Sequence, residues 1–247
     1  MPLAHRYALY LAPTGPWGEH GSRWLGRCAD TGLALAPLPG QPDAPPAWTQ
    51  APRHYGLHAT LKAPFRLRAG ATPHAVDAAA RELARSNQAF DVALECETLR
   101  GFLAWCIAED DTHGQARIQA LADAAVQQLD ALRAPPTPEE TARRQPQLLS
   151  PEQQAMLARW GYPYVFDTYT FHITLTGKLT GDALEQAQRH IAAFADPLRG
   201  QRMAVPGVSV FVQATPGADF VAARHYHFDG THTDAMGAEY LQGPATP

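Results

Sequence analysis

Two short histidine motifs carry the clearest chemical signal in the sequence. His58-Ala59-Thr60-Leu61 and His172-Ile173-Thr174-Leu175 share the pattern His-x-Thr-Leu, and they lie about half the chain apart. Residues i and i+2 of a β-strand point to the same face, so each histidine would share a face with its threonine. Two such strands facing one cleft would present two imidazoles and two hydroxyls.

Those four side chains are suited to cleaving a phosphodiester. An imidazole near neutral pH acts as a base or an acid. One imidazole would take a proton from the attacking oxygen, and the other would protonate the leaving oxygen. The threonine hydroxyls would donate to the nonbridging oxygens, where negative charge concentrates. The scheme needs no metal or other cofactor, predicts His58, His172, Thr60 and Thr174 as catalytic, and predicts a bell-shaped pH dependence around neutrality.

The elements around the motifs repeat as well. Each motif is expected in a strand, followed by a helix and then a pair of strands; these elements are predicted at 55–67, 73–86 and 90–108, and again at 164–176, 182–196 and 204–228. Apolar residues at helical spacing predict a further helix over 114–132, and proline-rich 36–52 is predicted as a loop. The recurrence indicates an internal duplication.

The chain has only two lysines, and each follows one motif. Lys62 and Lys178 would point to the same face as the histidines if alternation were strict, although a bulge at Gly177 would break it. Each lysine could offer a charge to a phosphate. The alternative is a solvated lysine at the end of a strand.

Further candidates for substrate binding are arginines and tyrosines. Arginine binds phosphate with two parallel hydrogen bonds, but adjacent arginines are also common at the end of a helix. Tyrosines in this setting are often partly buried with the hydroxyl at an edge. The candidates are Arg53, Arg143 and Arg144 for a second phosphate, with Tyr7, Tyr10, Tyr55 and Tyr164 for the cleft lining; Phe102 and Trp105 are expected in the core.

Composition narrows the class of protein. The chain has 247 residues, of which 45% are hydrophobic and 18% charged, and its formal net charge is −4. The apolar content supports a sizeable core, and the acidic balance argues against a protein that coats nucleic acid. There is no apolar run long enough for a membrane helix, the N-terminus does not resemble a signal peptide, and the three cysteines are scattered. We therefore expect a soluble cytoplasmic protein with a small phosphorylated ligand and no membrane partner; the oligomeric state stays open.

The motifs and the residues around them resemble a known family. The paired motifs resemble the 2H phosphoesterase superfamily, which includes cyclic phosphodiesterases and 2′,5′ RNA ligase-like proteins. The runs RYALYLAP, RHYGLHATLKAPFRL and LARWGYPYVFDTYTFHITLTGKL are similar to a bacterial branch known as phosphonate-metabolism proteins of unknown function.

This resemblance implies a bilobal α+β fold of two pseudo-symmetric antiparallel sheets with outer helices. One domain would span 1–247, with the first motif in a lobe at about 54–133 and the second in a lobe at about 162–229. It also implies metal-independent cleavage of a cyclic or 2′-linked phosphodiester by His58 and His172, with Thr60 and Thr174 binding the phosphate. The association with phosphonate genes suggests a small sugar substrate, such as a ribosyl 1,2-cyclic phosphate.

Two rival functions remain at this stage. In the first, the protein binds an RNA 2′,3′-cyclic end or a nucleotide in the same cleft, either without catalysis or as a ligase-like protein. Alternatively, His225 and His227 lie at i and i+2 on one predicted strand, which is also a metal-ligand spacing, and could serve a metal-dependent hydrolase. Treatment with a chelator separates the metal-dependent hypothesis from the metal-independent phosphoesterase.

Overall fold

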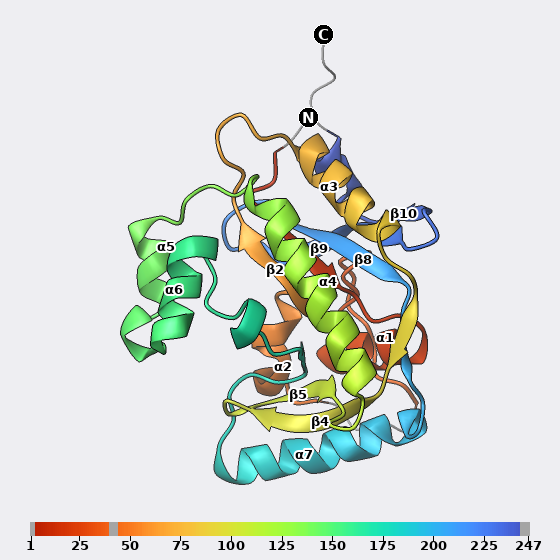
Figure 1. The fold of residues 1–247 in the computed structure, drawn as a ribbon. Helices are drawn as coiled ribbons and strands as arrows, with labels where there is room; N and C mark the ends of the chain where they lie inside the picture. The colour runs from red at the N-terminus through yellow and green to blue at the C-terminus, as the bar shows by residue number, and fades with distance from the viewer. Residues whose placement is uncertain (1–2, 40–43, 243–247) are drawn as a thin grey trace.

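One antiparallel sheet of eight strands organises the molecule (Figure 1). The computed structural model describes residues 3–39 and 44–242. Within them the strand order is β10-β9-β8-β1-β2-β6-β5-β4, and β3 pairs with β7 in a separate small sheet. The strands are β1 (Arg6–Leu11), β2 (Ala59–Phe65), β3 (Phe90–Val92), β4 (Leu94–Leu99), β5 (Phe102–Ile107), β6 (Ile173–Thr174), β7 (Met203–Val205), β8 (Gly207–Gln213), β9 (Phe220–His227) and β10 (His232–Asp234).

Seven α-helices lie in the described residues, and they cover and flank the sheet. They are α1 (Gly15–Leu25), α2 (Pro46–Arg53), α3 (Pro73–Arg85), α4 (Thr112–Asp130), α5 (Pro138–Arg143), α6 (Pro151–Trp160) and α7 (Gly181–Ala195). Helix α4 crosses over β2, and α7 runs beneath β4 and β5 in the view of Figure 1. No helix among the described residues is long and apolar enough to cross a bilayer.

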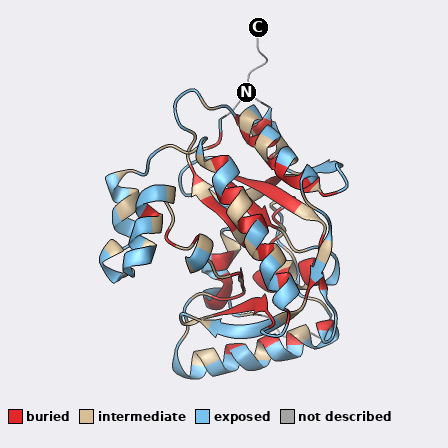
Figure 2. Cartoon of the chain, in the orientation of Figure 1, coloured by how far each residue is buried: buried red, intermediate tan, exposed pale blue. Residues whose placement is uncertain are grey.

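The predicted helices are confirmed where the periodic pattern is strong. In α4, Ile118, Leu121, Ala125 and Leu129 are each at most 1% exposed, as their spacing predicts. Helix α3 begins after Thr72, whose side chain accepts a hydrogen bond from the backbone N–H of Ala75. Helices α5 and α6 carry far less of the core, since α5 buries none of its residues and both appear mostly exposed in Figure 2.

The sheet interleaves the two halves of the chain. Strand β5, from the first half, pairs with β6 from the second half through Trp105 and Ile173. Strands β8 and β9, also from the second half, lie on the other side of β1, away from β2. The α+β prediction is therefore confirmed, whereas two duplicated lobes, each with its own sheet, are not shown by this topology.

Two local expectations differ from the structure. Only Ile173 and Thr174 of the predicted strand 164–176 join the ladder, because Phe166 has a left-handed φ of 52° and opens a 3₁₀ turn over Phe166–Thr168. The proline-rich segment also contains a helix, α2, because Pro46 at its first position needs no backbone N–H and Trp48 is buried. Residues 40–43 of that segment lie outside the described residues.

Candidate active site

The two His-x-Thr motifs meet in the middle of the large sheet. Strands β2 and β6 are antiparallel neighbours, and Ala59 lies opposite Ile173. Continuing this register by one residue on each side sets His58 against Thr174, and Thr60 against His172. Ala59 and Ile173 are fully buried, so the flanking residues project to the opposite face of the sheet.

All four motif side chains line one cleft. Its volume is about 370 Å³, and His58, Thr60, His172 and Thr174 all contribute to its wall. The prediction that the two motifs converge is thus supported by their placement. A cleft of this size suits a small ligand rather than a polymer.

Both histidines are oriented by the same backbone contact. Nδ1 of His58 lies 2.9 Å from the carbonyl oxygen of Gly56, and Nδ1 of His172 lies 2.8 Å from that of Thr170. A carbonyl can only accept, so Nδ1 carries the hydrogen and donates it. The neutral ring then has an unprotonated Nε2, which is the atom that can accept a proton from a reactant.

Gly56 supports this arrangement through its backbone conformation. Its φ of +75° is costly for residues with a Cβ. An added Cβ would also lie 2.8 Å from the Cβ of Ala29. The carbonyl that orients His58 therefore depends on a glycine two residues before the histidine.

The site favours neutral imidazoles in the free protein. The pKa of His58 is lowered to about 4, mainly by burial and also by the charge of His172, while the Gly56 carbonyl opposes the shift. Burial also lowers the pKa of His172, together with the charge of Arg100 and against the Thr170 carbonyl. A bound anion would raise both pKa values, because it stabilises the charged ring.

Aromatic rings hold the imidazoles in place. Tyr10 stacks on His58 with ring centroids 3.9 Å apart. The ring of Tyr55, in the segment just before β2, has its centroid 6.0 Å from that of His58. Phe102 packs against His172 at 5.6 Å and lines the cleft, although the sequence placed it in the core. Trp105, by contrast, is 1% exposed, as expected.

Four of the predicted substrate-binding residues also line the cleft. These are Tyr10, Tyr55, Arg144 and Lys178. The sequence interpretation missed Arg6 and Tyr162, which line it too. Arg6 shares a face of β1 with Tyr10, four residues away, and that alternation was the signal available to find it.

Lys62 lies elsewhere, because β2 contains a bulge. Tyr10 pairs with Thr60 but Leu9 pairs with Lys62, so one extra β2 residue interrupts the alternation. Lys62 is 3% exposed, and its Nζ donates to Asp130 Oδ1 at 2.7 Å, on α4. The expectation that Lys62 faces the cleft was wrong, and its role is in packing α4 against β2.

Two predicted tyrosines are also outside the cleft wall. Tyr7 lies on the buried face of β1, and its hydroxyl donates to the backbone carbonyl of Tyr240. Tyr164 lies under the guanidinium of Arg100, whose Cζ is 4.1 Å from the ring centroid. In both cases a neighbouring tyrosine, Tyr10 or Tyr162, takes the cleft position instead.

The arginines separate into two groups. Arg53 lies at the end of α2, where its backbone carbonyl accepts from Arg27, and it does not line the cleft. Arg143 and Arg144 end α5, as the helix-terminal alternative expected, but they also line a second cavity next to the cleft. Arg144 belongs to the walls of both cavities.

The proposed metal pair His225 and His227 lies at a different cavity. Nδ1 of His225 is 2.7 Å from Ser209 Oγ and its Nε2 is 3.0 Å from Asp30 Oδ1, so both ring nitrogens have partners. Nε2 of His227 is 3.2 Å from Thr233 Oγ1. Across residues 3–39 and 44–242, no group of three or more His, Cys, Asp or Glu side chains is arranged to hold a metal ion.

These observations define an α+β protein in which two central strands each present a histidine and a threonine to one cleft. The chain belongs to the DUF1045 family, described as a protein of unknown function, whose model matches residues 60–221.

Two curated relatives have the same name, ribose 1,5-bisphosphate phosphokinase PhnN. The protein from Laribacter hongkongensis (strain HLHK9) is 39% identical over 97% of this chain and 57% of its own length. The protein from Janthinobacterium sp. (strain Marseille) is 35% identical over 91% of this chain and 51% of its own length. The chain thus spans about half the length of these relatives.

Proposed function

We propose that this protein is a metal-independent phosphoesterase that hydrolyses a small cyclic phosphodiester. The observation that carries the proposal is the shared cleft of His58, Thr60, His172 and Thr174, with both Nδ1 atoms engaged by backbone carbonyls. This arrangement leaves two Nε2 atoms for proton transfer and two hydroxyls for the phosphoryl oxygens. The register about Ala59 and Ile173 supports a local twofold relation of the motifs, and we retain the two lobes, about 54–133 and 162–229, as part of the proposal.

The proposed reaction is attack of water on phosphorus. His58 accepts a proton from the water, the new P–O bond forms, and the ring P–O bond breaks. His172 gives its proton to the departing sugar oxygen, so the product is a phosphate monoester with a free hydroxyl. The hydroxyls of Thr60 and Thr174 donate to the nonbridging oxygens as charge builds there.

The roles of the two histidines follow from their surroundings. His58 is packed against Tyr10, and burial lowers its pKa to about 4, so it is neutral and able to accept a proton over most of the pH range. The pKa of His172 is also lowered. The anionic substrate would favour the protonated form of His172 on binding, as the general acid requires.

The relatives suggest the sugar. Their name includes ribose 1,5-bisphosphate, a phosphorylated ribose. We propose that the substrate here is a cyclic phosphate of a phosphorylated ribose. The resemblance to phosphonate-metabolism proteins is compatible with such a substrate. The name applies to proteins about twice as long, so their kinase activity is not carried over to this chain.

The kinase activity in the names of both relatives is the alternative, and the sequence argues against it. In a phosphate-binding loop, a Gly-Lys pair is followed by serine or threonine. Here Gly177-Lys178 is followed by Leu179. Incubation with ATP and ribose 1,5-bisphosphate should therefore give no ADP above the protein-free control.

Activity should survive removal of metal ions. Two histidines supply both acid and base, so no metal-bound water is required. We expect protein treated with EDTA and dialysed to hydrolyse at least one member of a panel of sugar and nucleoside cyclic phosphates at its untreated rate. Loss on chelation with recovery on adding zinc or manganese would favour the hydrolase built on His225 and His227. Tight binding of a nucleoside 2′,3′-cyclic phosphate without turnover would favour the binding role.

The pH optimum of kcat/KM should lie below neutrality. The acid limb reports loss of neutral His58, whose pKa is about 4. The alkaline limb reports loss of protonated His172, whose pKa lies below the usual 6.5. We therefore expect the optimum between these limits, lower than the optimum around neutrality that the sequence alone predicts. The profile should be measured at constant ionic strength. A value of kcat/KM that still increases above pH 6.5, about the ordinary pKa of imidazole, would contradict this assignment.

A further inference from the structure

A second cavity adjoins the histidine cleft and is lined by arginines. Its volume is about 250 Å³. It shares Arg6, Tyr55, Pro64 and Arg144 with the cleft, so a ligand can extend from one space into the other. We call it the arginine cavity.

The arginine cavity concentrates positive charge on an acidic protein. Five arginines line it, at positions 6, 66, 133, 143 and 144, and Glu140 is the one carboxylate in its wall. The whole chain has a formal net charge of −4, so this excess is local. A cavity with one sign of charge attracts ligands of the opposite sign.

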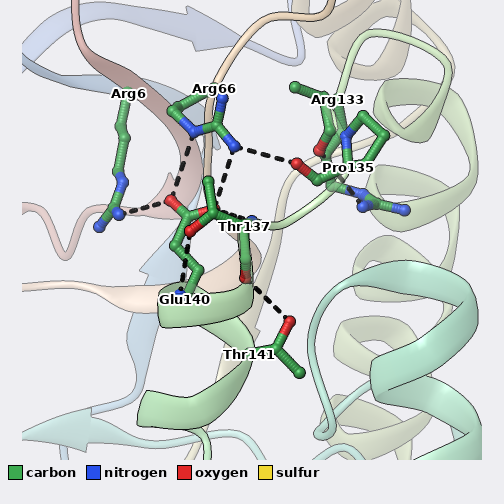
Figure 3. Close-up of polar contacts among 8 residues, drawn as sticks. Arg6, Arg66, Arg133, Pro135, Thr137, Glu140 and Thr141 are labelled. Atoms are coloured by element: carbon green, nitrogen blue, oxygen red, sulfur yellow. Dashed lines mark hydrogen bonds and ion pairs between the residues drawn. The ribbon is translucent and has the colours of Figure 1, made fainter.

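Glu140 holds two of the arginines in position. Figure 3 shows it between Arg6 and Arg66, with Arg6 Nη2 2.7 Å from Oε1 and Arg66 Nη2 3.1 Å from Oε2. Burial alone would raise the pKa of Glu140, but bonds from Arg66, the Thr137 backbone N–H and Arg6 lower it to about 2. The carboxylate is therefore ionised throughout the useful pH range and orients both guanidinium groups.

Three arginines keep donors for a ligand. Within the described residues, Arg6 uses only Nη2, on Glu140, and a guanidinium has five N–H donors. Neither Arg143 nor Arg144 has an ion-pair partner within 4.0 Å in the described part of the chain, although Arg143 acts on Glu139 at longer range. Arg144 lies over the ring of Tyr162, a residue of the cleft wall, at 4.9 Å.

We propose that the arginine cavity binds a phosphate monoester of the same substrate whose cyclic phosphate lies between His58 and His172. Arg6, Arg143 and Arg144 are the donors, since arginine matches phosphate oxygens with paired hydrogen bonds. The substrate class is thus a small cyclic phosphodiester that carries a second phosphate. This inference rests on the proposed function and goes further by assigning the substrate's second phosphate to the arginine cavity.

The test compares two substrates that differ by one phosphate. Ribose 1,2-cyclic phosphate is assayed with and without a 5-phosphate, using wild-type protein, Arg143→Gln, Arg144→Gln and the control Arg85→Gln. Arg85 is an exposed arginine at the end of α3 that lines neither cavity. We expect each cavity variant to reduce the preference for the 5-phosphorylated substrate, as a ratio of kcat/KM values, by roughly 10- to 100-fold, the loss typical of a charged hydrogen bond.

A binding measurement separates this inference from the proposed function. Ribose 5-phosphate, which has no cyclic phosphate, should bind the wild type, the Arg85→Gln variant and a His58→Ala/His172→Ala double variant, and should bind Arg144→Gln roughly 10- to 100-fold more weakly. If no cyclic phosphate is hydrolysed but this pattern of binding holds, the proposed function fails and the phosphate site stands. If neither substrate preference nor ribose 5-phosphate binding depends on Arg143 or Arg144, the inference is overturned.

Discussion

Replacing His58 or His172 with alanine is expected to lower kcat/KM for a cyclic phosphodiester by about 10²–10⁴-fold. Each imidazole is held through Nδ1 by a backbone carbonyl, and both rings line the same cleft. Loss of either ring removes one proton transfer from the transition state. The assay is initial-rate hydrolysis at the pH optimum, with circular dichroism to confirm that each variant is folded.

Matched variants make this result specific. Thr60→Ala and Thr174→Ala should cost less, about 1.5–3 kcal/mol of transition-state stabilisation, because each removes one hydrogen bond to a charged oxygen. His225→Ala changes an imidazole at the other cavity and should leave the rate unchanged. If His225→Ala abolished activity while His172→Ala retained it, the site would be wrongly placed.

Replacing Asp130 with alanine is expected to destabilise the fold by about 3–5 kcal/mol, because it leaves a buried charge without its partner. Lys62 is 3% exposed, and Asp130 accepts from both Lys62 Nζ and Arg133 Nε, at 2.7 and 2.8 Å. Burial lowers the pKa of Lys62, and the bond to Asp130 opposes that shift. Urea unfolding at neutral pH measures the change in free energy.

Two further variants decide whether the pair is the cause. Asp130→Ala combined with Lys62→Met should recover much of the stability, since the buried ammonium is then absent. Asp110→Ala, at an exposed position just before α4, should change stability by no more than about 0.5 kcal/mol. An Asp130→Ala variant as stable as the wild type would mean that the ion pair between Lys62 and Asp130 does not stabilise the fold.

Local patterns in the sequence predicted much of the site. The period-2 spacing within each His-x-Thr motif placed histidine and threonine on one face, and both motifs line the same cleft. Helical spacing correctly predicted that Ile118, Leu121, Ala125 and Leu129 of α4 are buried, whereas Leu132, in the same pattern, lies beyond the helix and is half-buried. These features depend on residues close together in the chain, so one sequence is enough to find them.

The remaining features depend on contacts between distant strands. The bulge that turns Lys62 away arises where β2 pairs with Leu9 and Tyr10 of β1, and alternation counted along β2 alone cannot detect it. The wrong prediction for Tyr7 has the same cause. Which face of β1 meets the cleft depends on its pairing with β2 and β8, which are distant in sequence. The pairing of β5 with β6 likewise joins the two halves of the chain. The repeat in the sequence predicts instead that each half forms its own sheet.

The most direct test of the central claim is hydrolysis in water labelled with oxygen-18. Metal-stripped protein is incubated with the 5-phosphorylated ribose cyclic phosphate, and the product is followed by phosphorus NMR and mass spectrometry. Attack of water on phosphorus predicts a ring-opened phosphate monoester with one labelled oxygen on the phosphorus, formed by the wild type and not by the His58→Ala/His172→Ala double variant. An unchanged cyclic phosphate, a label on the sugar, or equal turnover by the double variant would contradict the two-histidine account.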